Sequence, residues 1–419
     1  MSIISSQNVN SIIRRTLSTI NPNIMVHGEI VGYMLYKMLE YDQSYSEQEL
    51  LDYTMLGILH DIGLYREEGV KNVADFEERS AWEHSIYGFL FLKYLSPIGD
   101  RAEIVLYHHL DYNRYGLVKS KYEHVTECLA LADQMDNFMR AGKVSMETDY
   151  FSRYRNIKFS GDALDLFLKA EKKYGITEKL ASGAYREELY EMLSHRIFSE
   201  KYKKGFLEML VYTIDFRSEY TVLHTMATVF FAEQLGRLMK LAARELRDMY
   251  YGALLHDLGK IAIPLSILES PGRLSDKEMS VMKAHVKITE AILSGLVNDN
   301  VFQIAIRHHE KLDGSGYHRG LTEKDLTLPQ QIVAVADMLS ALYGKRSYKE
   351  AFDTDRIKQI LNEDAENHKI SKSTVDCLMK NYDQVIRRYE EKKDETVGLY
   401  LNIKEQFEEI LKKFEGIMQ

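Results

Sequence analysis

Cysteine is scarce in this chain of 419 residues, which holds only Cys128 and Cys377. The two residues lie too far apart in the sequence to form a thiolate ligand pair, and two cysteines cannot build a disulfide framework. This usage fits a reducing compartment, and we therefore expect a cytoplasmic protein.

Long apolar runs are also missing. No segment approaches the roughly 20 consecutive apolar residues that a membrane-spanning helix needs, and residues 1–15 lack the apolar core of a signal peptide. Positive charge is in deficit, because 63 acidic residues outnumber 54 Lys and Arg and leave a net charge of −9. A general binding surface for DNA, RNA or an acidic membrane is therefore disfavoured, although a local basic pocket is not.

Proline is rare as well, at five residues, and few stretches alternate between polar and apolar side chains as strands do. Both observations predict an all-α fold. The motifs Ser46-x-x-Glu49 and Ser275-x-x-Glu278 predict capping boxes at the starts of two helices. The length allows two or three domains, each able to bury its own core.

What the sequence has instead is one ordered set of histidines and aspartates that occurs twice, always as His, His-Asp, His, His-His, Asp. The set in the second half is His224, His256, Asp257, His285, His308, His309 and Asp337. The set in the first half is His27, His60, Asp61, His84, His108, His109 and Asp133. Repetition over this length indicates two copies of one domain.

The repeated residue types are metal ligands. Imidazoles and carboxylates suit first-row metals such as Fe, Mn or Zn, and the absence of thiolates from the set argues against structural zinc. The motif Leu-His-Asp-x-Gly also occurs twice and ends at Gly63 and Gly259, where we expect each helix to stop.

The sequence around Asp257 indicates hydrolysis. Asp257 is the natural bridging carboxylate for two divalent metals about 3.5–4 Å apart, which can hold a bridging hydroxide that attacks phosphorus. Lys260 lies three residues further on, so its ammonium can reach a phosphate or a leaving oxygen. We therefore expect Asp257 and Lys260 to be the catalytic residues.

Longer motifs in the second half carry a family resemblance. Thr221-x-x-His224 is followed by the stretch 256–260, which reads HDLGK, and by the stretch 308–317, which reads HHEKLDGSGY. Over residues 212–350 these motifs resemble the HD-GYP family of the HD phosphohydrolase superfamily. The resemblance implies an enzyme that opens a cyclic dinucleotide, either cyclic di-GMP to pGpG and onward to GMP, or 3′,3′-cyclic GMP-AMP.

The resemblance also implies substrate contacts. Gly314, Gly316 and Tyr317 would line the nucleotide site, and Arg346 and Lys349 would bind phosphate, because residues 345–349 resemble the family's RPY segment. Glu310 and Asp313 are expected to fix the loop rather than to bind metal.

The second half departs from the family pattern at three places. His318 replaces the proline of GYP and is expected either to contact substrate or to be exposed. Ser340 stands where the family's Asp-Ala-Leu-Thr-Ser run has its aspartate. A third metal would need a glutamate at the position of Tyr220, although Glu219 lies beside it, so we expect two divalent ions, Fe or Mn.

The first copy keeps all seven candidate ligands, so metal in this domain is expected too. It has Leu64 in place of Lys260, lacks a GxGY loop after His109, and offers only Arg140 as a basic residue after Asp133. Three interpretations stay open: a metal-loaded regulatory domain that binds a ligand or senses metal or oxygen, a second HD hydrolase of other specificity, and a structural relic.

The expected architecture is therefore two tandem HD-type helical domains joined by connecting helices. Residues 1–145 form a divergent, regulatory HD domain, residues 146–205 the connector, and residues 206–419 an HD-GYP-like catalytic domain with C-terminal helices. The amphipathic tail 404–418 either packs on its own domain or forms a homodimer contact.

Two alternatives to the phosphodiesterase remain. One is a catalytically weak receptor for the cyclic dinucleotide, and the other is an HD-type nucleotidase or phosphatase. The expected partner is a cyclic dinucleotide, with no DNA, RNA or membrane.

Overall fold

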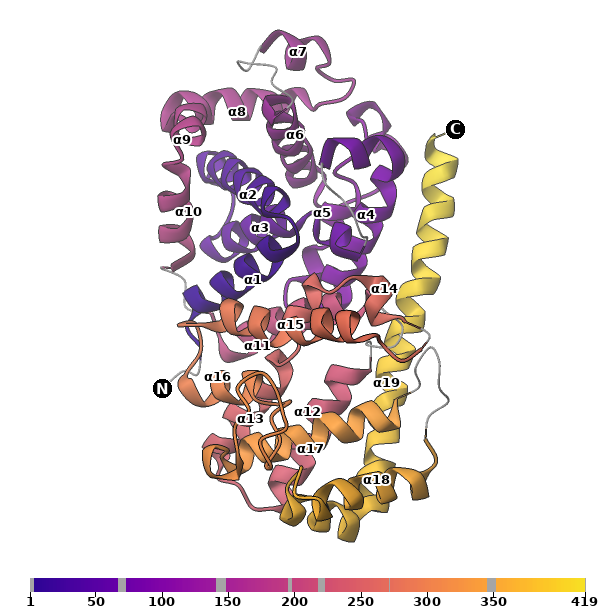
Figure 1. The fold of residues 1–419 in the computed structure, drawn as a ribbon. Coiled ribbons are helices and arrows are strands. Elements are labelled where there is room, and N and C mark those ends of the chain that lie inside the picture. The colour runs from indigo at the N-terminus through magenta and orange to yellow at the C-terminus, as the bar shows by residue number, and fades with distance from the viewer. Residues whose placement is uncertain are drawn as a thin grey trace. The chain divides into compact units, whose positions relative to one another are not determined.

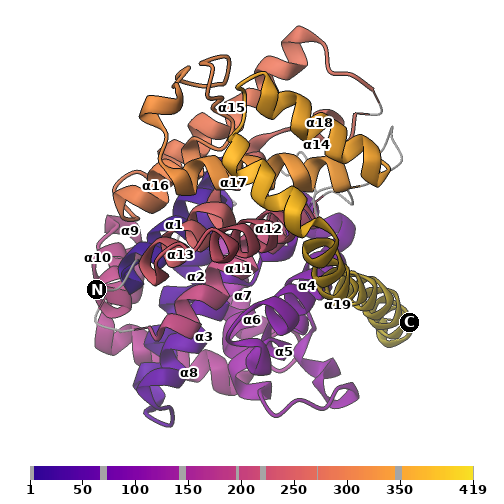
Figure 2. The same cartoon turned by 90° about the horizontal axis from the view of Figure 1, so that it is seen from below.

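The computed structural model describes residues 4–66, 73–140, 148–194, 198–217, 223–270, 272–344 and 352–418. Within these ranges the chain is built of α-helices and short 3₁₀ helices, with two isolated β-bridges and no strand (Figures 1 and 2). The predicted all-α fold is therefore confirmed.

The chain forms two compact units. The N-terminal unit contains residues 20–209 and 402–419, and the C-terminal unit contains residues 1–19 and 210–401. Three boundaries separate them: one at the last residue of α1 (Ser6–Ile20), one inside α11 (Glu200–Asp215) and one inside α19 (Lys372–Met418).

The two units are built on the same plan. In the N-terminal unit α2 packs against α3 and α6, and in the C-terminal unit α12 packs against α13 and α17. The helices of the N-terminal unit are α2 (Pro22–Asp42), α3 (Glu47–Leu59), α4 (Val73–Leu95), α5 (Glu103–Leu106), α6 (Glu123–Arg140), α7 (Thr148–Arg153), α8 (Gly161–Tyr174), α9 (Ile176–Ser182) and α10 (Tyr185–Ser194). Those of the C-terminal unit are α1 (Ser6–Ile20), α12 (His224–Leu238), α13 (Ala243–Leu255), α14 (Leu265–Leu268), α15 (Asp276–Leu293), α16 (Asp299–Ile306), α17 (Leu328–Tyr343) and α18 (Thr354–Glu366).

Both predicted capping boxes are confirmed. At the start of α3, Glu49 N donates to Ser46 Oγ over 3.3 Å and Ser46 N donates to the Glu49 carboxylate over 2.9 Å. At the start of α15 the corresponding distances between Ser275 and Glu278 are 3.4 and 2.8 Å. These reciprocal bonds satisfy backbone donors that a helix start would leave unpaired.

The two motif glycines act differently from the expectation that they terminate helices. α13 ends at Leu255, and Gly259 lies in the following 3₁₀ helix η4 (Leu258–Ala262). A Cβ on Gly259 would lie 2.0 Å from the carbonyl oxygen of His285, and one on Gly63 would lie 2.1 Å from that of His84. The glycine is therefore required so that the turn can approach the helix that carries the third histidine.

The first helix lies outside the domain to which the sequence assigned it. α1 belongs to the C-terminal unit, where Arg15 Nη1 donates to the carbonyl oxygens of Ile292 and Ser294 over 3.1 and 2.7 Å (Figure 1). These carbonyls close the end of α15, where a cation also interacts favourably with the helix dipole. The structure therefore differs from the expectation that residues 1–145 form one domain, because its first 19 residues belong to the C-terminal unit.

The C-terminal tail likewise belongs to the unit other than the one expected from the sequence. Residues 402–419 belong to the N-terminal unit, where the ring of Phe407 stacks on Tyr87 at 4.1 Å and that of Phe414 packs on Trp82 at 4.5 Å. Arg114 Nη1 donates to the carbonyl of Ile417 over 2.9 Å. The expectation that the tail packs on its own domain was wrong, and the apolar face that favoured a dimer contact is occupied within the chain.

The segment predicted as a connector is part of the N-terminal unit. α8 packs on α2 and α6, and α10 packs on α2, where Tyr33 donates to Glu188 over 2.9 Å. Burial of Phe167 and Leu189 explains this docking, because both side chains lose contact with water there.

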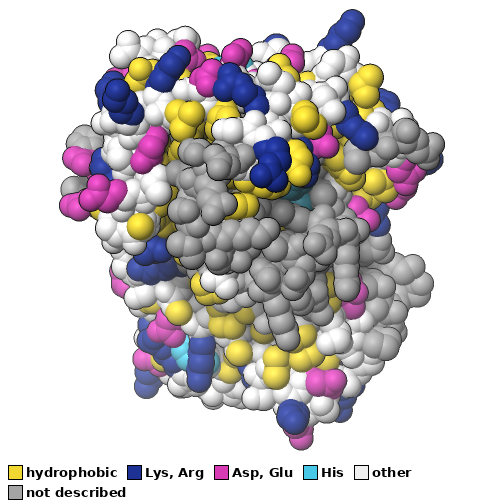
Figure 3. Space-filling view, turned by 90° about the horizontal axis from the view of Figure 1, so that it is seen from above, with side chains coloured by type: hydrophobic (Ala, Val, Ile, Leu, Met, Phe, Trp, Pro, Cys, Tyr) yellow, Lys and Arg dark blue, Asp and Glu magenta, His cyan; other side chains and the backbone are white. Residues whose placement is uncertain are grey.

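Charges are mixed on the face in Figure 3. Wherever residues are described on that face, Lys and Arg side chains alternate with Asp and Glu and no large field of one sign forms. Among the described residues no helix is long and apolar enough to cross a membrane.

Candidate metal centre in the C-terminal unit

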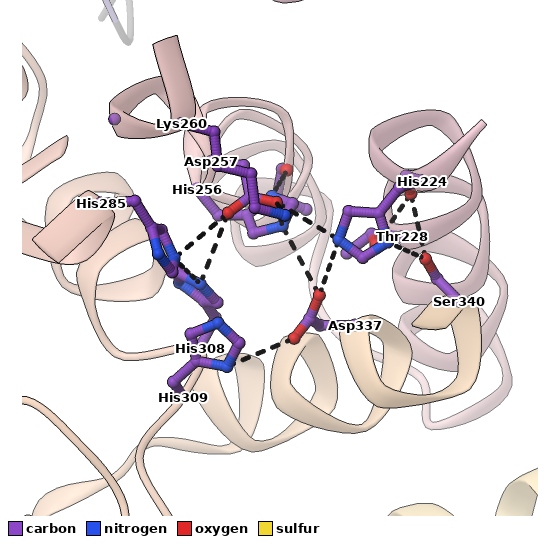
Figure 4. Close-up of polar contacts among 12 residues, drawn as sticks. His224, Thr228, His256, Asp257, Lys260, His285, His308, His309, Asp337 and Ser340 are labelled. Carbon is purple, nitrogen blue, oxygen red and sulfur yellow. Dashed lines mark hydrogen bonds and ion pairs between the residues drawn. The ribbon is translucent and has the colours of Figure 1, made fainter. Parts of the chain in front are cut away.

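The structure brings the seven candidate ligands of the second half together from five places in the fold (Figure 4). His224 opens α12, His285 lies in α15 and Asp337 lies in α17. The remaining ligands follow the ends of α13 and α16, and they are His256, Asp257, His308 and His309. The helix bundle thus gathers positions separated by more than a hundred residues.

Asp257 lies at the centre of this group. Its Oδ2 is 3.0 Å from His256 Nε2 and 3.3 Å from His224 Nε2. Its Oδ1 is 3.3 Å from His285 Nε2 and 3.9 Å from His308 Nε2. One carboxylate therefore faces two sets of imidazoles, one with each oxygen, which is the arrangement that a bridging ligand requires.

Asp337 connects the two sets from the opposite side. Its Oδ1 is 3.1 Å from His224 Nε2, and its Oδ2 is 3.6 Å from His309 Nδ1. His309 and His224 are also the most exposed of the seven side chains, at 28% and 14%. The centre is therefore open to solvent on this side.

The backbone fixes which imidazole nitrogen faces the centre. Nδ1 of His256, His285 and His308 lies 2.6–2.7 Å from the carbonyl oxygen three residues earlier. Because a carbonyl only accepts, each Nδ1 carries the hydrogen and each Nε2 presents a lone pair. Such backbone contacts are the usual outer support of metal-binding histidines.

Buried atoms at the centre lack hydrogen-bond partners. These are Nε2 of His256 and both oxygens of Asp257, although Oδ2 of Asp257 also forms an ion pair with the ammonium of Lys260. Leaving such atoms unpaired in an interior is costly. The donor set fits divalent cations, which would satisfy all of these atoms at once.

Electrostatics keep the carboxylates charged. Burial alone would raise the pKa of Asp257, but His256 and Lys260 lower it well below its ordinary value. For His309 burial dominates and lowers the pKa to about 3. Burial alone would lower the pKa of His256, but Asp257 and Asp337 outweigh it and raise the pKa to about 10. A metal ion bound at the centre would displace this proton from Nε2, because a ligating imidazole is neutral.

Lys260 contacts the bridging carboxylate. Its ammonium forms an ion pair with Asp257 Oδ2, and its side chain is 16% exposed. Arg217 donates to the carbonyl oxygens of Lys260 and Ile261 and so supports this turn. Burial lowers the pKa of Lys260, but Asp257 more than offsets this and raises it, so the group stays cationic.

The loop 310–321 is fixed by the two acids expected to do so. Glu310 accepts from the backbone N–H of Arg319 and Leu321 over 2.7 and 2.9 Å, and Asp313 accepts from Ser315 over 2.9 Å. Both roles agree with the expectation that these acids hold the loop.

The two loop glycines are needed for different reasons. Gly314 has φ +80°, which disfavours other residues, and a Cβ on Gly316 would lie 2.3 Å from Lys311 N. These conformations allow the loop to fold back over its own start.

Tyr317 lies at the edge of the centre. Its ring is 4.7 Å from that of His309, and its backbone N–H donates to the carbonyl of His309 over 3.1 Å. The ammonium of Lys283 lies 4.9 Å from the ring centroid. Lys283 could not be singled out from the sequence, because a lysine on a charged helix face is ordinarily solvated.

His318 is not exposed, which was one of the two expectations for it, whereas a contact with substrate stays a prediction. The imidazole is 15% exposed, and its Nε2 lies 3.0 Å from Glu290, which also pairs with Arg319. The expectation of an exposed side chain was wrong, because the imidazole lies against Glu290 on α15.

Ser340 supports the first ligand. His224 Nδ1 lies 2.6 Å from Ser340 Oγ, and the hydroxyl donates to the carbonyl of His224 over 3.1 Å. The sequence marked this position only as a lost carboxylate. Its spacing of three residues after Asp337 is the signal that places it on the same helix face.

Four predicted positions lie outside the described residues. They are the phosphate-binding candidates Arg346 and Lys349, and the positions Glu219 and Tyr220 considered for a third metal. Gly314, Gly316 and Tyr317 are the substrate candidates that the structure places.

The N-terminal set is gathered in the same manner. His27 Nε2 lies 2.9 Å from Asp133, and Asp61 Oδ1 lies 3.5 Å from His60 Nε2 and 3.4 Å from His84 Nε2. His108 belongs to the same cluster as His60 and Asp61. His109 Nε2 lies 2.8 Å from His84 Nε2.

Comparison with known families agrees with the two repeated sets. A model described as an HD domain matches residues 209–372, and a second model, also described as an HD domain, matches residues 27–138. Each match contains one complete set of the seven residues.

Individual relatives fall in one functional class. A 3′3′-cGAMP-specific phosphodiesterase 1 of Vibrio cholerae is 24% identical over 391 residues, 89% of this chain and 90% of the relative. A cyclic di-GMP phosphodiesterase response regulator of Xanthomonas campestris is 49% identical over 127 residues, 30% of this chain and 32% of the relative. This chain thus spans about a third of the Xanthomonas protein.

A solved structure shares the fold. The crystal structure of a cyclic GMP-AMP specific phosphodiesterase from V. cholerae aligns with a TM-score of 0.56 at 17% identity. The alignment covers 91% of this chain and 98% of that one. The helical fold of this chain is therefore one that a solved structure also has.

Proposed function

We propose that this protein, which belongs to the HD domain family and carries two HD domains, hydrolyses a phosphodiester bond of a cyclic dinucleotide in its C-terminal domain. The observation that carries the proposal is the position of Asp257. Its two oxygens face two sets of imidazoles, and the ammonium of Lys260 lies on the same carboxylate. Relatives with cyclic-dinucleotide phosphodiesterase names support the substrate class.

The ligand set fits two divalent ions, for which we propose Fe or Mn. His224, His256 and Asp337 would serve one ion, His285, His308 and His309 the other, and Asp257 both. Such ions, when bound, lower the pKa of coordinated water and neutralise charge on phosphoryl oxygens.

Lys260 has a separate task. Its ammonium is held at the centre by Asp257 and carries charge that can neutralise a phosphate oxygen or a leaving alkoxide. Because Arg217 anchors the backbone of the same turn, this charge is positioned before substrate binds.

Tyr317 and Lys283, at the edge of the centre, could recognise a nucleotide. The ring of Tyr317 lies beside that of the partly exposed His309, and the ammonium of Lys283 lies 4.9 Å from the centroid of the Tyr317 ring. An aromatic ring binds a base by stacking, and a lysine binds phosphate as a point charge. We propose Arg346 and Lys349 as further phosphate contacts.

The test uses the full chain loaded anaerobically with Fe or Mn. Cyclic di-GMP, 3′,3′-cyclic GMP-AMP and a mononucleotide are incubated separately, and products are separated by chromatography. We expect a linear dinucleotide from at least one cyclic substrate. Release of phosphate from the mononucleotide alone would indicate a nucleotidase, and tight binding without cleavage would indicate a receptor.

Replacing Tyr317 by alanine is expected to raise KM for the cyclic dinucleotide by about 5–150-fold, since a stacked base contributes about 1–3 kcal/mol. Tyr317→Phe keeps the ring and should stay within about threefold of the wild-type KM, by the same argument. Steady-state kinetics with metal content measured in each variant distinguish the two. Equal KM values for all three proteins would remove Tyr317 from the binding site.

A further inference from the structure

The N-terminal domain has buried donor atoms that its own structure does not satisfy. Nε2 of His60 and His108 and Oδ2 of Asp61 have no hydrogen-bond partner, and all three side chains are buried. The hydrolytic function proposed for the C-terminal domain does not use these atoms. Some other group must offset the cost of burying them.

The lone pairs of these imidazoles converge. His60 Nδ1 lies 2.8 Å from the carbonyl of Gly57, and His108 Nδ1 lies 2.6 Å from that of Val105. Each Nδ1 therefore carries the hydrogen, and each Nε2 faces the cluster that contains Asp61. This is the orientation that a cation requires of its ligands.

The two domains differ in the side chain that contacts Nδ1 of the first histidine. His27 Nδ1 lies 2.6 Å from Asp136, and Arg140 holds that carboxylate with an ion pair. At the same spacing after the last ligand, the C-terminal domain has the neutral Ser340. A carboxylate behind a histidine makes the imidazole a stronger metal ligand than a hydroxyl does.

The two centres also differ in access. The side chains of His27, Asp133 and His109 are 0%, 0% and 6% exposed. Their counterparts His224, Asp337 and His309 are 14%, 9% and 28% exposed. In addition, buried Leu64 occupies the position of Lys260, so this position supplies no cation for a phosphate.

An HD domain with a complete ligand set is expected to bind divalent metal, and we propose that Asp136 makes the N-terminal pair of ions the more tightly held of the two metal centres. Asp61 bridges the pair, since its Oδ1 lies 3.5 Å from His60 and 3.4 Å from His84 while its Oδ2 faces His27 at 3.8 Å. Asp136 is a positioning residue that acts through His27. The enclosed pair stabilises the domain and takes no part in dinucleotide cleavage.

The first experiment counts metal in the full chain with the C-terminal centre removed by His256→Ala and Asp257→Ala. After loading with Fe or Mn we expect about two ions per chain, the number that one bridging carboxylate can join. The converse variant, His60→Ala with Asp61→Ala, should lose the same number and still cleave substrate. A folded His256/Asp257 variant that binds no metal would overturn the proposal, whatever the catalytic result.

The second experiment tests Asp136 by the rate at which a chromogenic chelator removes metal. In the His256/Asp257 background, Asp136→Asn should release metal about 10–100-fold faster, the usual effect of losing an outer-shell partner. Arg140→Gln, which leaves the buried carboxylate in place, should change the rate in the same direction by less. Helical content by circular dichroism verifies folding.

A reciprocal substitution gives the matched control. In the His60/Asp61 background, Ser340→Asp places a carboxylate behind His224 and should slow metal release from the C-terminal centre. If Asp136→Asn and Ser340→Asp both left the rate of metal release unchanged, the residue behind the first histidine would not determine how tightly each centre holds its metal. Faster release from the intact N-terminal centre than from the C-terminal one would equally contradict the proposal.

Discussion

Asp257→Asn is expected to lower kcat for cyclic-dinucleotide cleavage by at least about 10³-fold, a loss typical of removing charge that stabilises a transition state. The substitution keeps the shape of the side chain but removes the negative charge shared by His256, His285 and Lys260. An amide is a poor bridge between two cations, and Lys260 would lose the partner that positions it. Metal content and kcat are measured on the same preparation.

Asp61→Asn is the matched control for this variant. It makes the same chemical change at the equivalent position of the N-terminal domain, where Asp61 faces His60 and His84. We expect it to lower metal content but to leave turnover within about tenfold of wild type, since no catalytic charge is removed. If Asp61→Asn abolished turnover and Asp257→Asn did not, the catalytic centre would lie in the N-terminal domain.

Gly259→Ala is expected to destabilise the C-terminal unit by about 3 kcal/mol, the upper part of the range for overpacking, and to release its metal. The new Cβ would lie 2.0 Å from His285 O and 2.9 Å from Thr289 N, which are backbone atoms of α15. Because backbone atoms of a helix cannot rotate away, the turn that carries Asp257 must move. The hydrogen bond from Gly259 N to Thr289 Oγ1, now 2.9 Å, would lengthen too.

Chemical denaturation with a metal count measures this effect. Gly398→Ala provides the control, because a Cβ there meets nothing within 4 Å and the residue lies inside α19. That variant should gain about 0.5–1 kcal/mol of stability, since alanine is the better helix former. If Gly259→Ala were as stable and as metal-rich as wild type, the close contact with α15 would not be required.

The helical fold and the clustering of the candidate ligands could be predicted because they depend on local or repeated patterns. The sets beginning at His27 and His224 recur in the same order, and the capping boxes at Ser46 and Ser275 are short motifs. All fourteen positions lie in two clusters within the described residues.

The partners of individual helices could not be predicted. The apolar stripe of α1, which includes Val9 and Ile13, shows that one face is buried but not that α15 lies near it. The tail containing Phe407 and Phe414 has the same ambiguity. In both cases the partner is determined by packing between residues some 280 to 330 positions apart, such as Arg15 and Ser294 or Tyr87 and Phe407.

The residues that support the candidate histidine ligands from behind could not be predicted from the sequence either. A serine at position 340 and an aspartate at position 136 are ordinary helix residues until the ring of His224 or His27 is known to lie beside them. Likewise, Gly259 follows a helix end in the sequence. Glycine is required there because the turn lies against the backbone of α15, a segment that comes later in the chain.

The measurement that most directly tests the central claim is cleavage of a cyclic dinucleotide by the Mn- or Fe-loaded chain in water enriched in heavy oxygen. We predict a linear dinucleotide whose terminal phosphate carries one heavy oxygen atom, since water is the nucleophile and the ring phosphodiester is the bond that opens. Intact cyclic dinucleotide after incubation with a protein that has a full complement of metal would contradict the account.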